Sequence, residues 1–155
     1  MYKKIAAVGV VLSLFAGCAS VPMESPEASA VAKTFSAPAP GTAGLYIYRA
    51  AGVGTALKKD VWVDGKCIGE TAPNMFFYEE VEGDQKYKIS TESEFGNNDL
   101  IVQTQSGRNY YIKQYIKMGL FVGGANLKLM SEQSGKEAIS KLELAKKGVC
   151  SKRYR

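Results

Sequence analysis

The chain has 155 residues, a formal net charge of +5 and no histidine. This length suits one domain, and so mild an excess of basic residues argues against a nucleic-acid-binding protein. Without histidine the chain lacks the commonest general base and the commonest metal ligand, so we expect no enzymatic activity, no cofactor and no metal site. Nine tyrosines and 16 glycines favour β structure, because aromatic residues favour strands and glycine serves turns.

Residues 1–17 have the three parts of a secretion signal. The pair Lys3-Lys4 is followed by an apolar run, Ile5 to Phe15, and then by the small residues Ala16-Gly17. About 11 apolar residues are too few to cross a bilayer as a helix, which needs about 20. The pattern is typical of a removable signal peptide.

The run Leu14-Phe15-Ala16-Gly17-Cys18 resembles the lipobox of bacterial lipoproteins, with Phe15 where leucine is commonest. The resemblance implies that Cys18 receives a diacylglyceryl group, becomes the first residue after cleavage and is then acylated, as with palmitate. Three acyl chains would hold the protein on a membrane, whereas one gives only marginal binding. Ala19, in place of aspartate, implies the outer membrane, facing the periplasm. The alternative is an ordinary signal cleaved near Ala19-Ser20, which would discard Cys18.

Residues 18–43 contain this cysteine and a segment rich in alanine, serine and proline that shows no sustained apolar period. Such a composition is typical of a flexible tether. Stretched fully, about 25 residues at about 3.3 Å each would span roughly 80 Å. The alternative is that part of the segment, such as residues 31–35, packs on the domain as a short helix.

Residues 44–155 form the predicted globular domain, in which the hydrophobic period is mostly two. Asp64-Gly65 is the strongest hairpin signal and suits a type I′ turn. Every connection looks too short for a parallel crossover, so we expect a mainly β fold: an antiparallel β-sandwich or barrel-like sheet. The alternating runs cover residues 45–49, 61–63, 66–69, 75–81, 86–91, 100–105, 110–117 and 126–130.

One C-terminal helix is predicted over about 134–147. Ser134 and Glu137 fit a capping box, and Gly148 is placed to end the helix. Its apolar face would contain Ala138, Ile139, Leu142 and Ala145.

Three segments of the domain resemble small proteobacterial lipoproteins that are grouped by a domain of unknown function: Gly44–Arg49, Val61–Gly69 and Tyr110–Lys113. The resemblance covers roughly residues 44–145 and implies a fold and a location, but no activity. Residues 63–69 also resemble the PEGA-type β-sandwich, which is associated with carbohydrate. The Pro-x-Gly-x turn of that family is replaced here by Val81-Glu82-Gly83-Asp84.

Cys67 and Cys150 remain once Cys18 is lipidated, and two cysteines in an oxidising compartment either pair or stay as separate thiols.

Two groups of acidic residues are candidates for calcium binding or catalysis. Glu79–Asp84 lacks the ligand spacing of a calcium loop and fits a solvated strand end. Glu92, Glu94 and Asp99 would suit glycoside hydrolysis only if two of them faced each other.

Two further segments carry weaker hypotheses. Leu120, Phe121 and Val122 lie between glycines, and we favour a bend tucked into the core over a surface that contacts a partner or lipid. Lys152, Arg153 and Arg155 form a basic tail, which suits an anionic surface or a solvated, frayed terminus equally.

These observations lead to one main hypothesis and two alternatives. The main hypothesis is an envelope lipoprotein, anchored to the membrane, whose non-catalytic β-domain binds a protein or glycan partner. One alternative is a small-ligand carrier in the periplasm; the other is a hydrolase that uses acidic residues. The oligomeric state is not predicted. In the carrier, aromatic side chains would line a cavity: Trp62, Phe76, Phe77, Tyr110 and Tyr115.

Overall fold

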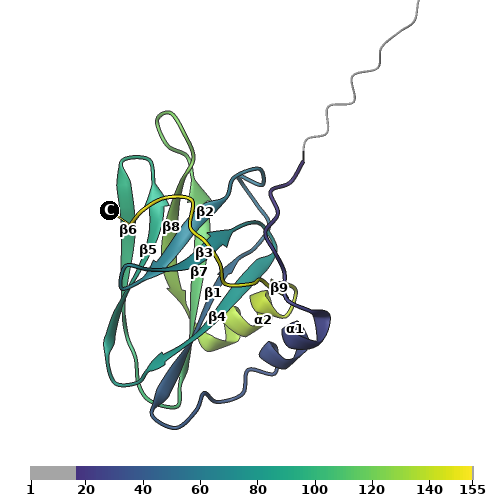
Figure 1. The fold of residues 1–155 in the computed structure, drawn as a ribbon, viewed down its shortest axis with the longest axis vertical. Coiled ribbons are helices and arrows are strands. Elements are labelled where there is room, and N and C mark those ends of the chain that lie inside the picture. The colour runs from purple at the N-terminus through teal and green to yellow at the C-terminus, as the bar shows by residue number, and fades with distance from the viewer. Residues whose placement is uncertain (1–16, 155) are drawn as a thin grey trace, which may run out of the picture.

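A computed structural model of the chain describes residues 17–154. The charged and apolar parts of the predicted signal therefore lie outside the described residues, as does Arg155. The described chain forms two β-sheets that pack face to face, with helices on the outer face of one of them (Figure 1). The elements are β1 (Thr42–Arg49), β2 (Lys59–Val63), β3 (Lys66–Thr71), β4 (Met75–Glu82), β5 (Lys86–Ser93), β6 (Gly96–Gln103), β7 (Asn109–Lys117), β8 (Gly124–Met130), β9 (Glu143–Leu144), α1 (Pro26–Ala32) and α2 (Glu132–Ile139).

The five-stranded sheet has the order β8-β7-β1-β4-β9, and the four-stranded sheet has the order β3-β2-β5-β6. The predicted mainly β sandwich with a C-terminal helix is thus confirmed. The expectation that every pairing is antiparallel is wrong, because β1 pairs with β7 and β4 pairs with β9 in parallel. A parallel pair needs the chain to cross back, and here whole strands of the second sheet provide that crossing between β1 and β7.

Alternation along the strands divides the core into two layers. On β1, Leu45 and Ile47 point between the sheets, whereas Tyr46 and Tyr48 point to the outer face of the five-stranded sheet. Leu45 and Ile47 are buried by the facing sheet, and Tyr46 and Tyr48 are buried because helices cover the outer face. Burial of each such side chain contributes about 1.5–3 kcal/mol.

The Asp64-Gly65 hairpin joins β2 and β3 as predicted. Both residues have positive φ, 48° and 76°, which is the backbone of a type I′ turn. The Asp64 carboxylate also accepts a hydrogen bond of 2.7 Å from the backbone N–H of Lys88. The turn is therefore fixed to β5 as well as to its own two strands.

The prediction of a flexible tether over residues 18–43 is wrong for most of its length. Helix α1 begins after Ser25, whose side chain caps it, and lies beside β9. The buried Ser29 hydroxyl donates to the Glu143 carboxylate at 2.6 Å and accepts from the backbone N–H of Leu144 at 3.0 Å. The alternative of a helix at residues 31–35 placed the helix too far along the chain.

Aromatic packing explains why this proline-rich segment is ordered. The Phe35 ring contacts the rings of Tyr46 and Tyr111, and the Tyr46 hydroxyl donates to the Ala32 carbonyl at 2.9 Å. Local composition predicts disorder when a segment has no apolar face of its own. Here the apolar surface is supplied by a distant sheet, so composition alone was misleading.

Helix α2 is shorter than predicted and begins earlier. Ser131, not Ser134, is its N-cap, and its side chain accepts from the backbone N–H of Ser134. The helix ends at Ile139 because the chain then turns to add β9 beside β4. Gly148 therefore does not end a helix; its N–H donates to the Ile68 carbonyl at 2.9 Å.

Candidate functional site

Cys18 is a free and exposed cysteine at the start of the described chain. The next residue already belongs to the fold, because the Ala19 N–H donates to the Thr55 carbonyl at 2.9 Å. Adjacent Cα atoms are about 3.8 Å apart, so Cys18 cannot lie far from the surface of the domain. In Figure 1 the described chain begins at the upper end of the molecule. Among the described helices, none has the length and apolar character needed to span a membrane.

Three loops meet at this upper end: residues 50–58, the β5–β6 turn at 94–95 and the β7–β8 loop at 118–123. We call them the apical loops. The first and third touch, since a Cβ built on Gly123 would lie 2.8 Å from the Leu57 side chain. The buried Arg49 guanidinium holds loop 50–58 by donating to the carbonyls of Leu57 and Gly54, at 2.6 Å each. Burial lowers the pKa of Arg49 below its usual value.

The Glu94 carboxylate organises the β7–β8 loop. It accepts hydrogen bonds from the backbone N–H groups of Leu120 (2.7 Å), Phe121 (2.5 Å) and Val122 (3.2 Å). Burial raises the pKa of Glu94, but these three bonds together outweigh it and lower the pKa below its usual value. A Cβ at Gly119 would collide with the Val122 carbonyl and with the Glu94 carboxylate, so only glycine fits there.

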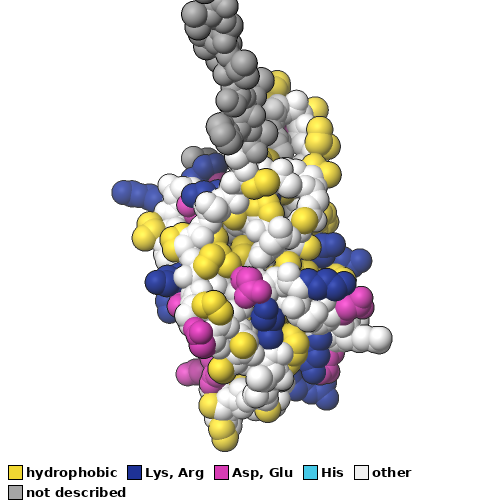
Figure 2. All heavy atoms as spheres, turned by 90° about the vertical axis from the view of Figure 1, so that its right-hand side faces the viewer, with side chains coloured by type: hydrophobic (Ala, Val, Ile, Leu, Met, Phe, Trp, Pro, Cys, Tyr) yellow, Lys and Arg dark blue, Asp and Glu magenta, His cyan; other side chains and the backbone are white. Residues whose placement is uncertain are grey.

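This arrangement satisfies the loop backbone and leaves the side chains in solvent. Leu120 and Phe121 are 83% and 84% exposed. The favoured interpretation of this run as a bend tucked into the core is therefore wrong, and its exposure keeps the partner or lipid surface as a hypothesis. Figure 2 shows hydrophobic side chains at the upper end of the molecule. The exposed apolar residues of the apical loops, which we call the apical patch, are Val53, Phe95, Met118, Leu120, Phe121 and Val122.

The predicted basic tail is fixed to the four-stranded sheet. A disulfide joins Cys67 to Cys150. The buried Asp60 carboxylate accepts from the backbone N–H groups of Ser151 (3.0 Å) and Lys152 (2.8 Å). The tail is thus not a frayed terminus in its described part.

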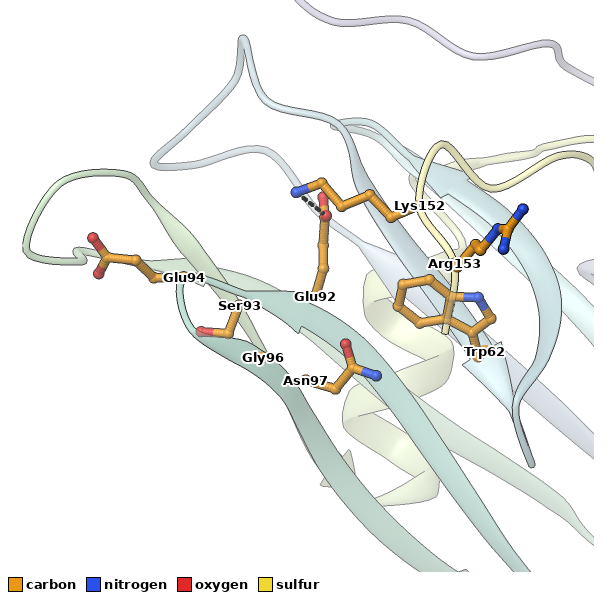
Figure 3. Close-up of a pocket in the computed structure, with 8 residues that line it drawn as sticks. All are labelled: Trp62, Glu92, Ser93, Glu94, Gly96, Asn97, Lys152 and Arg153. Atoms are coloured by element: carbon orange, nitrogen blue, oxygen red, sulfur yellow. Dashed lines mark ion pairs between the residues drawn. The ribbon is translucent and has the colours of Figure 1, made fainter. Parts of the chain in front are cut away.

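The end of the tail covers Trp62 and pairs with a buried carboxylate. The Tyr154 ring packs edge-on against Trp62 with centroids 5.8 Å apart. Glu92 is buried and lies 2.7 Å from the Lys152 ammonium (Figure 3). It also lies 3.6 Å from the ammonium of Lys59. Lys152 is therefore engaged with Glu92 while Arg153 is exposed. The hollow drawn in Figure 3 is small, about 80 Å³.

The three carboxylates considered for glycoside hydrolysis serve other partners. Glu92 pairs with lysines, and Figure 3 shows Glu94 pointing away from it, toward the β7–β8 loop. Asp99 lies 4.0 Å from the Lys88 ammonium. The acidic run at 79–84 likewise has partners within the chain, such as Ser106 for Asp84. Within residues 17–154 no three histidine, cysteine or acidic side chains are grouped as a metal site.

The aromatic residues expected to line a carrier cavity are dispersed. Phe77 lies between the sheets, Phe76 lies beneath α2 and Trp62 lies under the tail. Tyr110 packs at the rim of the inner core, and Tyr115 is partly exposed beside loop 50–58. The structure does not bring these five side chains together around one cavity.

A groove that the sequence did not predict lies beside α2. It has a volume of about 480 Å³, an apolar floor that includes Tyr48 and Met130, and a charged rim that includes Lys113, Glu137 and Lys141. The Tyr48 ring is itself buried, and the groove runs between α2 and residues 50–51 above it. Sequence periodicity signalled the buried face of α2, but nothing in it signalled a hollow beside the helix.

Comparison with known proteins gives a family but no activity. Residues 39–125 match the family described as "Protein of unknown function (DUF2846)". The chain is 53% identical over 145 residues to an "Uncharacterized protein" of Haemophilus influenzae, covering 94% of this chain and 85% of that protein. No solved structure matches this chain. The chain therefore belongs to the DUF2846 family of unknown function.

Proposed function

We propose that this protein is a lipoprotein of the bacterial cell envelope, anchored through acylated Cys18, and that its β-sandwich binds a protein or glycan partner without catalysing a reaction. The observation that carries the proposal is Cys18 itself. It is exposed, free and joined directly to the fold, and it follows a run that resembles a lipobox. The Cys67–Cys150 disulfide supports an oxidising compartment, where such bonds persist.

The groove beside α2 is the partner site that we propose. Its size falls in the range of ligand-binding pockets, about 300–1,000 Å³. An apolar floor with a rim of both charges suits a peptide segment or a sugar chain, and the PEGA-like hairpin at residues 63–69 adds support for a glycan. The groove lies beside α2 on the outer face of the five-stranded sheet, and its lining includes Ala50 and Ala51 at the start of loop 50–58.

The anchor is tested by intact mass spectrometry of the protein purified from its native membranes. We expect an N-terminal Cys18 that carries the mass of three acyl chains. Cys18→Ser should remove this mass, whereas the matched variant Ser20→Ala should retain it. A water-soluble product without acyl mass would contradict the proposal, as would a chain that begins beyond Cys18.

The partner site is tested by capture from detergent-solubilised envelopes and by co-sedimentation with purified cell-wall glycan. Lys141→Glu reverses a charge on the groove rim, and Lys86→Glu makes the same change on β5 of the other sheet. We expect capture of a protein, or sedimentation with glycan, that Lys141→Glu weakens and Lys86→Glu does not. Equal effects of the two variants, or no binding above background, would contradict the proposal.

A further inference from the structure

We propose that the apical patch is the surface on which the domain meets the bilayer, and that Leu120, Phe121 and neighbouring side chains insert between the lipid head groups of the membrane that holds Cys18. This inference rests on the proposed anchor and adds an orientation and a lipid-contacting loop to it. Four observations carry it.

The first observation is the short connection between Cys18 and the folded domain. The Ala19–Thr55 hydrogen bond fixes the chain to loop 50–58 immediately after the cysteine. That loop in turn contacts the β7–β8 loop through Leu57 and Gly123, and the end of β7 through Gly54 and Ile116. Acyl chains on Cys18 therefore hold the apical loops, rather than any other face, against the membrane surface.

The second observation is the chemistry of the patch. Met118, Leu120 and Phe121 are each more than four-fifths exposed, and Phe95 on the neighbouring turn is 78% exposed. Exposed apolar residues that are contiguous on a protein surface mark a site of contact with a protein or a membrane. Because the anchor already places lipid at this end, the bilayer is the apolar phase within reach.

The third observation is that the loop backbone is prepared for an apolar environment. Unsatisfied backbone N–H groups make entry into lipid costly. The N–H groups of Leu120, Phe121 and Val122 already donate to the Glu94 carboxylate, which holds the loop tip in one shape. Glu94 is therefore a positioning residue that presents the apolar side chains and does not itself contact lipid.

The fourth observation is the charge around the patch. Lys117 is exposed at the base of the β7–β8 loop and lines a hollow with Met118 and Leu120. Arg153, which is exposed, lines the hollow that Glu94 and Gly96 border (Figure 3). Basic side chains near the membrane surface attract anionic head groups, whereas an apolar contact alone would not discriminate between anionic and uncharged lipids.

The experiment places a tryptophan in the patch of the lipidated protein. Phe121→Trp is compared with Val149→Trp, because Phe121 and Val149 are both 84% exposed and Val149 lies in the tail rather than in the apical loops. Each protein is reconstituted in vesicles of phosphatidylethanolamine and phosphatidylglycerol, some of whose acyl chains carry bromine near the head group. The parent protein, whose Trp62 is buried, gives the background emission that is subtracted from each variant.

We expect the added emission of the Phe121→Trp protein to be blue-shifted and mostly abolished by brominated lipid, and that of the Val149→Trp protein to be unchanged. Adding Glu94→Ala to the Phe121→Trp protein should weaken the quenching, while circular dichroism shows that the fold is retained. Intact mass of the same sample reports acylation separately. Absent acyl mass contradicts the proposed anchor, whereas acylated Phe121→Trp protein that brominated lipid does not quench overturns the inference alone.

Two other occupants of the patch have distinct signatures. A second copy of the chain would give a dimer in detergent that Leu120→Ser dissociates, and brominated lipid would then not quench the Phe121→Trp protein. A protein partner would shift the emission of the Phe121→Trp protein only when envelope extract is added. Either result would overturn membrane insertion.

Discussion

Removal of the Cys67–Cys150 disulfide is the sharpest test of how the tail contributes to stability. The bond closes a loop over a sequence separation of 83 residues. The chain-entropy relation for a loop of this length gives about 4.5 kcal/mol at 25 °C. We therefore expect the double variant Cys67→Ser/Cys150→Ser to lose about 4 kcal/mol of unfolding free energy, a large part of the total for a domain of this size.

Urea unfolding at pH 7, followed by tryptophan emission, measures this loss. Trp62 suits the purpose because Tyr154, at the end of the tail, packs on its ring. With an m-value of about 2 kcal/mol per molar urea, the midpoint should fall by about 2 M. Reduction of the native protein with dithiothreitol is the matched control and should give the same shift.

A loss below about 1 kcal/mol, with an unchanged m-value, would refute the reasoning. It would mean that the tail leaves the sheet once the covalent link is removed, because the hydrogen bonds from Ser151 and Lys152 to Asp60 do not hold it by themselves. The unfolded-state entropy on which the magnitude depends would then not be the relevant quantity.

Three further predictions concern the outer face of the five-stranded sheet. Gly135→Ala should destabilise the protein by about 1–3 kcal/mol in thermal unfolding, because a methyl group there would collide with the Tyr111 ring; a stabilised variant, as helix propensity alone predicts, would contradict the packing. Tyr111→Phe should be neutral or stabilise by up to about 1 kcal/mol in the same assay, because its buried hydroxyl has no hydrogen-bond partner among the described residues; a clear loss of stability would show that the hydroxyl is satisfied. Hydrogen bonds from Ser29 and Lys33 lower the pKa of Glu143. Docking of α1 should therefore be complete above the ordinary carboxyl pKa of 4.5 and should weaken as pH falls through the lowered pKa of Glu143. Hydrogen exchange of the α1 amides should show this weakening, and Glu143→Gln should remove its dependence on pH.

The pattern of side chains along the chain was sufficient to predict the sandwich and its hairpins. Alternation on β1, with Leu45 and Ile47 opposite Tyr46 and Tyr48, is a local property that each strand displays by itself. The Asp64-Gly65 turn is equally local, because few residues adopt two successive positive φ angles. Ile139 and Leu142 were likewise predicted as buried, since helix periodicity identifies the apolar face even when the ends of the helix are misplaced.

The order of residues 19–42 and the exposure of the β7–β8 loop were decided by contacts between residues far apart in the sequence. Serine and proline composition indicated a tether, but Ser29 meets Glu143 across a separation of 114 residues. Three apolar residues between glycines indicated a core bend, but Glu94, 26 residues earlier than Leu120, holds that loop outward. Such contacts depend on which surfaces the sheets bring together. The sequence by itself therefore determined the longer strands, their inward faces and the lipobox-like run, whereas only the tertiary structure decided where the N-terminal segment lies and which apolar residues remain exposed.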